Sequence, residues 1–89
     1  MDETKIAQLK EKLLEIISPL IITKCTDFDV RSLYNEIEKE WLVALFYKRA
    51  GRIDSIVIAT GKEEIIKEAE KLLDGFIEDK MSTNQFLKL

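Results

Sequence analysis

The chain has 89 residues, which is enough for one domain and too few for two. Hydrophobic residues make up 46% of it and charged residues 35%, a balance that excludes intrinsic disorder. No apolar run approaches the roughly 20 residues that a membrane-spanning helix needs. The formal net charge of −3 argues weakly against nonspecific nucleic-acid binding, without excluding a local basic patch.

The composition also restricts catalysis. The chain has no histidine, so the commonest general base and metal ligand is missing. Cys25 is the only cysteine, which excludes an intramolecular disulfide and a cysteine-based metal site within one chain. We therefore expect no enzyme activity, no cofactor and no metal site. The acidic N-terminus lacks an apolar signal segment, so we expect a cytoplasmic protein, and the wealth of Lys and Glu is typical of thermophiles.

Residues 3 to 18 are predicted to form an amphipathic helix. Apolar residues recur at alternating spacings of three and four from Ile6 to Ile16 and beyond, with lysine and glutamate mostly outside this stripe. Pro19 has no backbone N–H and disfavours helical geometry in the residue before it. We therefore expect the helix to end at Ser18 or to bend sharply there.

The next two segments are predicted to be a strand and a short helix. Residues 20 to 26 are rich in β-branched side chains, which favour a strand. Asp29 is interpreted as an N-cap, with Asp27 as the alternative. It would begin a helix from Val30 to Lys39, where apolar residues recur at helical spacing.

Residues 41 to 48 and 53 to 60 predict a β-hairpin, with Gly51 in the turn. The first arm is apolar on both faces, which indicates a central strand covered on both sides. Thr60 then begins a capping box for a final helix over residues 61 to 79, whose apolar face is the widest in the chain.

These elements predict an α+β fold with the order α-β-α-β-β-α. A small antiparallel sheet of about three strands would pack against the two long amphipathic helices. Residues 1 to 80 would form a single domain, and residues 81 to 89 a C-terminal tail.

Three features could carry chemistry, and each has a simpler structural explanation. Cys25 has no histidine to activate it and fits a small buried hydrophobe. Asp27 and Asp29 could bind a divalent cation, but a turn followed by a helix cap explains both acids. Gly61 and Lys62 suggest a phosphate loop, but the first glycine of that motif is absent.

Aromatic and apolar residues near element ends are candidates for a partner or dimer surface. Tyr34 and Trp41 lie near such ends and carry polar atoms that need partners. The tail residues Phe86, Leu87 and Leu89 are more apolar than expected for a terminus that packs against nothing. They would either fold back onto the sheet or add a strand to the sheet of a neighbour.

A basic cluster at the tip of the hairpin is a candidate nucleic-acid contact. Lys48, Arg49 and Arg52 could bind phosphates in the manner of a winged-helix wing, with residues 30 to 39 as the recognition helix. Solvated turn charges are the simpler interpretation, because the helix predicted there carries several glutamates.

The leading hypothesis is a non-catalytic protein-interaction module, either a homodimer or a small accessory subunit of a larger assembly. Its basis is the excess of apolar surface over what a small sheet can cover. The alternative is a nucleic-acid-binding regulator that uses the basic tip. A small enzyme using Asp27, Asp29 and either Lys24 or Lys62 ranks last. No membrane contact is expected.

Overall fold

Two helices flank a run of three strands along the chain. The computed structural model describes residues 2–82, in the order α1 (Glu3–Ile22), β1 (Thr26–Asn35), β2 (Glu40–Arg49), β3 (Arg52–Gly61) and α2 (Glu63–Ser82). The α+β class and the two long helices are confirmed. The predicted order α-β-α-β-β-α is wrong, because a single strand fills the segment between α1 and β2 and gives the order α-β-β-β-α.

Helix α1 begins at an aspartate cap and runs past its predicted end. The Asp2 carboxylate accepts a hydrogen bond of 2.8 Å from the Lys5 N–H, which satisfies a free donor of the first turn. Of the two outcomes predicted at Pro19, an end of the helix at Ser18 is wrong, because α1 continues to Ile22. Pro19 removes the hydrogen bond to the Glu15 carbonyl, and both residues are solvent exposed, so water can replace the missing donor.

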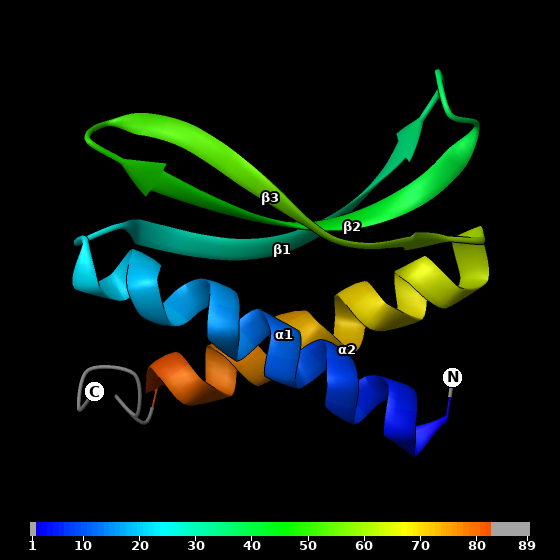
Figure 1. Cartoon of the computed structure of the whole chain (residues 1–89), viewed down its shortest axis with the longest axis horizontal. Coiled ribbons are helices and arrows are strands. Elements are labelled where there is room, and N and C mark those ends of the chain that lie inside the picture. The colour runs from blue at the N-terminus through cyan, green and yellow to red at the C-terminus, as the bar shows by residue number, and fades with distance from the viewer. Residues whose placement is uncertain (1, 83–89) are drawn as a thin grey trace.

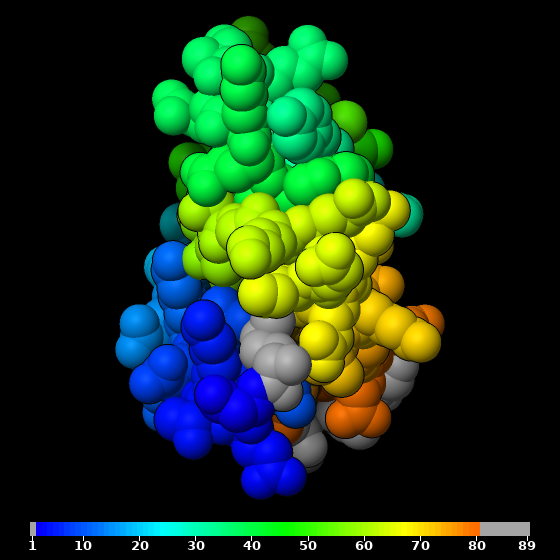
Figure 2. Space-filling view, turned by 90° about the vertical axis from the view of Figure 1, so that its right-hand side faces the viewer, coloured from blue at the N-terminus to red at the C-terminus, as the bar shows by residue number. Residues whose placement is uncertain are grey.

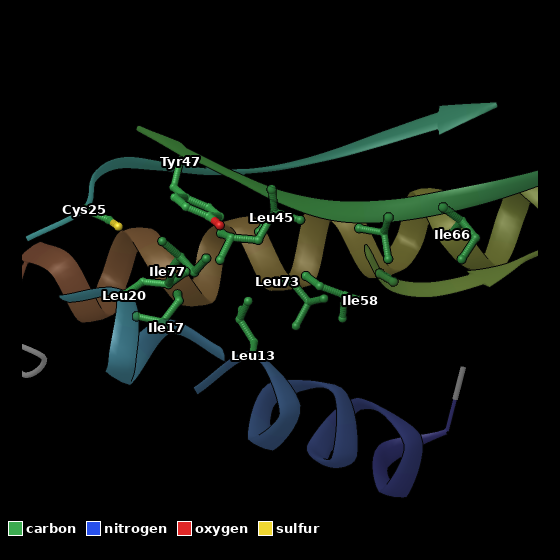
Figure 3. Close-up of a cluster of buried hydrophobic side chains, with 13 residues drawn as sticks. Leu13, Ile17, Leu20, Cys25, Leu45, Tyr47, Ile58, Ile66, Leu73 and Ile77 are labelled. Carbon is green, nitrogen blue, oxygen red and sulfur yellow. The ribbon is translucent and has the colours of Figure 1, made fainter. Parts of the chain in front are cut away.

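The strand predicted for residues 20 to 26 is wrong as well, because most of that segment is the last turn of α1 and its cap. The Cys25 N–H donates to the Leu20 carbonyl and the Lys24 N–H to the Ile21 carbonyl, both at 2.9 Å. These two bonds define a Schellman motif. Lys24 supplies the left-handed residue, with φ 65°, where glycine is usual. The motif turns the chain toward the sheet and brings Cys25 beside Leu20 in the core (Figure 3).

Strand β1 occupies the segment predicted to be a helix from Val30 to Lys39. It pairs antiparallel with β2, with a register shift beside Asp27, whose φ is 56°. Asp29 therefore caps no helix. Asn35 ends the strand, and its side-chain oxygen accepts hydrogen bonds from two N–H groups of the β1–β2 turn.

The predicted hairpin is confirmed as β2 and β3, with β2 in the centre of a sheet ordered β1-β2-β3. Ala50 and Gly51 form its two-residue turn, with φ values of 50° and 79° that are typical of type I′. A bulge inserts Ile58 between the residues of β3 that pair with Val43 and Ala44.

Helix α2 is the predicted last helix, but the capping box at its start is not formed. Thr60 still belongs to β3, which ends at Gly61, and α2 begins at Glu63. The first helical bond runs from the Ile66 N–H to the Lys62 carbonyl at 2.9 Å. One side of α2 buries a stripe of four residues: Ile66, Ala69, Leu73 and Ile77.

Both helices lie on the same face of a strongly twisted sheet, and they cross below it in Figure 1. The prediction that β2 is covered on both sides is therefore wrong for the described residues. The core lies between the helices and one face of the sheet (Figure 3). Its largest fully buried side chains are Leu13, Ile17, Val30, Val43, Leu45, Ile58, Ile66 and Leu73.

Candidate interaction surface

The face of the sheet opposite the helices carries apolar side chains from all three strands. Directly paired residues of an antiparallel sheet point to the same side, so the register assigns the members of this face. Three of them are well exposed, Leu33 at 46%, Val57 at 48% and Ile53 at 69%. Neither α1 nor α2 covers them. We call this set the open face: Leu33, Leu42, Ala44, Phe46, Ile53 and Val57.

A shallow groove with a volume of about 460 Å³ lies at the end of the open face near the β2–β3 turn. Leu33, Phe46 and Ile53 supply its apolar lining. Phe46 is half-buried and Ile53 is largely exposed, so the groove offers apolar surface to a partner without any movement of the backbone. A surface of this kind is typical of a docking site.

Charged residues of both signs border the groove. The Arg31 guanidinium lies 2.7 Å from the Asp29 carboxylate, and the Lys48 ammonium lies 3.4 Å from the Asp27 carboxylate. These side chains are 40–65% exposed, so each ion pair contributes little to stability. They make the border polar and nearly neutral, as the rim of a protein interface is.

Side chains from the helices bind the backbone of both outer strands. The Ser32 N–H in β1 donates to the Glu70 carboxylate of α2. An N–H group has one proton, so this donor is not free to pair with another strand. In β3, the Ile58 carbonyl accepts a bond of 2.6 Å from the Lys12 ammonium. Glu70 thus occupies one donor of the β1 edge, which disfavours strand addition at Ser32.

The predicted interaction residues Tyr34 and Trp41 come together, but on the side of the sheet that faces the helices. They pair across β1 and β2, with ring centroids 5.7 Å apart. The Lys67 ammonium of α2 lies 5.0 Å from the Trp41 ring centroid. Tyr34 is 48% exposed, whereas Trp41 packs against the core. The other predicted members, Phe86, Leu87 and Leu89, lie outside the described residues.

The predicted basic cluster is present at the β2–β3 turn. Lys48 is engaged by Asp27, and the Arg49 guanidinium lies 5.9 Å from the Tyr47 ring centroid. Arg52 pairs with Arg49 across the hairpin. The winged-helix interpretation loses its recognition helix, because residues 30 to 39 form most of β1 and its turn.

Asp27 and Asp29 act as ion-pair partners rather than as the helix caps predicted for them, since no helix follows them. Over residues 2–82, no group of three or more potential metal ligands lies close enough together to hold an ion.

Cys25 is buried at the end of α1, and its thiol contacts polar groups. Burial is the largest influence on its pKa and raises it. Hydrogen bonds with Arg49 and Thr23 and the positive charge of Arg49 lower it, so the pKa lies below its ordinary value. The folded state thus ionises Cys25 more readily than the unfolded chain does. Ionisation of Cys25 therefore increases the free energy of unfolding as the pH rises above its pKa in the folded state. This contribution is complete above its pKa in the unfolded chain.

We predict that Arg49→Met raises the pKa of Cys25, because it removes the cationic partner of the thiolate. The thiolate absorbance near 240 nm, read against Cys25→Ser, reports the single cysteine as a function of pH. Arg52→Met is the matched control and should leave the titration unchanged. A titration of Cys25 that is the same in both variants would refute the role given to Arg49.

Sequence reasoning did not place Leu33, Phe46 and Ile53, the apolar residues of the groove, on a common surface. The signal that could have found them is the first arm of the hairpin, which is apolar on both faces. Two helices on one side of a three-stranded sheet leave the second apolar face without a cover. Phe46 belongs to that second face, whereas its neighbour Leu45 belongs to the core.

Comparisons of the chain with protein-family models, with curated proteins and with solved structures gave no match. Neither α1 nor α2, the two helices among residues 2–82, is suited by length and hydropathy to cross a bilayer.

Proposed function

We propose that this protein is a non-catalytic interaction module that forms a homodimer through the open face of its sheet. The observation that carries the proposal is the row of apolar side chains on a sheet face that neither helix covers. Burial of apolar area is the main favourable term in protein association. A polar border and an apolar centre are the usual anatomy of an interface.

The size of the chain also favours a partner. A small domain of this kind gains stability from a partner, since its own core is limited.

A second copy is the occupant that the charges favour. A two-fold interface brings the same patch of both copies together, so the patch must be complementary to itself. The border of the groove has this property, because Arg31 and Lys48 lie beside Asp29 and Asp27. A strongly acidic partner would repel the two aspartates of this border, and a strongly basic partner would repel Arg31 and Lys48.

We predict that Phe46→Glu weakens the dimer by at least about 30-fold, because it places a carboxylate in the apolar groove, where a large aromatic contributes about 2 kcal/mol or more. Sedimentation equilibrium over a range of concentrations gives the dissociation constant. Ile22→Glu is the matched control, since Ile22 is 74% exposed at the end of α1, away from the open face.

The wild-type chain and Ile22→Glu are expected to dimerise alike, and circular dichroism should show that Phe46→Glu is folded. A wild-type chain that stays monomeric at millimolar concentration contradicts the homodimer. If a monomer binds a different protein and Phe46→Glu abolishes that binding, the module is an accessory subunit instead.

A further inference from the structure

The two ends of the sheet carry opposite charge. The β1–β2 turn, residues 35–40, contains Glu36, Glu38 and Glu40 against Lys39 alone, which gives −3 + 1 = −2. The β2–β3 turn, residues 48–52, contains Lys48, Arg49 and Arg52, which gives +3 within the turn, and Asp27 of β1, 3.4 Å from the Lys48 ammonium, offsets one of these charges. The strands between the turns are ten residues long, or roughly 33 Å at about 3.3 Å per residue. The charges are therefore well separated along the sheet.

Each end also exposes a large apolar side chain. Ile37, in the acidic turn, is 90% exposed, and Ile53, beside the basic turn, is 69% exposed. The acidic turn projects beyond both helices, at the top of the molecule in Figure 2. Nothing on its own chain, within the described residues, covers Ile37. An isoleucine this exposed on a projecting turn is suited to contact with a partner.

We propose that the two copies stack antiparallel, so that the acidic turn of each copy lies against the basic turn of the other. This inference rests on the proposed homodimer and specifies its geometry. In the aligned class of face-to-face packing, two sheets keep their strands within about 30° of each other. A two-fold axis across the strands exchanges the ends of the sheet and joins unlike turns at both ends. It also brings Ile37 of one copy toward Ile53 of the other.

The alternative arrangements are less favourable. A two-fold axis along the strands would set acidic turn against acidic turn and basic against basic, which is repulsive at both ends. A dimer that continues the sheet through β1 would have to displace Glu70 from the Ser32 N–H. Of these three arrangements, the antiparallel stack is the one that uses the open face and pairs the charges.

The test uses two charge-reversed variants and their mixture. Glu36→Lys with Glu38→Lys changes the first turn from −2 to +2, since −2 + 4 = +2. Lys48→Glu with Arg52→Glu changes the second turn from +3 to −1, since +3 − 4 = −1. Each variant alone should dimerise at least about tenfold more weakly than the wild type, because like charges then meet at both ends.

An equimolar mixture of the two variants should form a heterodimer with nearly wild-type affinity. In the heterodimer, the turns that meet at each end of the sheet again carry opposite charges. Native mass spectrometry separates the heterodimer from both homodimers by mass, and sedimentation equilibrium gives the affinities. The controls carry the same charge changes on the helices, Glu11→Lys with Glu15→Lys and Lys5→Glu with Lys71→Glu. They should leave the wild-type affinity unchanged within about threefold.

Each outcome decides the question. A heterodimer no stronger than the homodimers, from a wild-type chain that does dimerise through Phe46, overturns the antiparallel stack and leaves the proposed function intact. Weakening by the helix controls as large as that by the turn variants also overturns it, because net charge would then explain the effect. A wild-type monomer overturns both proposals.

Discussion

Leu45→Ala is expected to lower the free energy of unfolding by about 3 kcal/mol. Leu45 is fully buried in the central strand, with Val30 and Ile56 as its neighbours across the sheet. Figure 3 shows its side chain pointing toward the helices, near Tyr47. Truncation removes apolar contacts and leaves a cavity between the sheet and the helices, which the neighbouring side chains can fill only in part. A loss of this size is a large fraction of the stability of a small domain.

Urea denaturation measures this loss, and Val57→Ala is its control. Val57 lies on the open face with 48% exposure, so its truncation should cost less than 1 kcal/mol in the monomer. Both substitutions belong in the Phe46→Glu background, where dimer formation does not add to the measured stability. If Leu45→Ala and Val57→Ala lower the free energy of unfolding equally, both faces of the sheet are buried to the same extent, which would contradict the structure.

The parts of the fold that the sequence predicts well are those where local preference and packing agree. The β2–β3 hairpin combines two apolar arms with Gly51 at a position of positive φ. Helix α2 repeats its apolar residues regularly, and the stripe from Ile66 to Ile77 is buried, whereas Ile65 and Leu72 at its margins are each 38% exposed. The cap at Asp2 agrees with the predicted start of α1.

The failures occur where a local signal competes with packing or is missing. Lys24 takes the left-handed cap position, so no glycine marks the end of α1, and Pro19 marks an end that does not exist. The helical spacing from Val30 onward is outweighed by pairing with the apolar β2, which buries Val30 in the core. Strand pairing is a long-range interaction, so a pattern within one segment cannot reveal it.

The same limit applies to the interaction surface. The sequence indicates an excess of apolar residues, but which face they leave open depends on where the helices pack. Tyr34 and Trp41 were chosen for their positions near element ends, and the register places them opposite the open face. The sequence leaves Phe46 as either a core or a subunit-interface residue, since alternation along β2 does not tell which of the two apolar faces receives the helices.

Ala69→Leu is expected to lower the free energy of unfolding by about 3 kcal/mol, for the opposite reason to Leu45→Ala. Ala69 has no exposed surface and lies in the stripe of α2 that packs on the sheet. A leucine there adds three carbon atoms where the packing leaves no space, so α2 must move away from the sheet. Ala7→Leu on the exposed side of α1 is the control and should change stability by less than about 0.5 kcal/mol.

This displacement has a second consequence, because Glu70 follows Ala69 in α2. When α2 moves away from the sheet, the Glu70 carboxylate leaves the Ser32 N–H, and this donor of the β1 edge becomes free to pair with other chains. Ala69→Leu should therefore aggregate more readily than Leu45→Ala at equal stability, as measured by light scattering at matched fractions unfolded. Equal aggregation of the two variants would contradict the protective role of Glu70, and an unchanged urea midpoint in Ala69→Leu would contradict the close packing of α2 on the sheet.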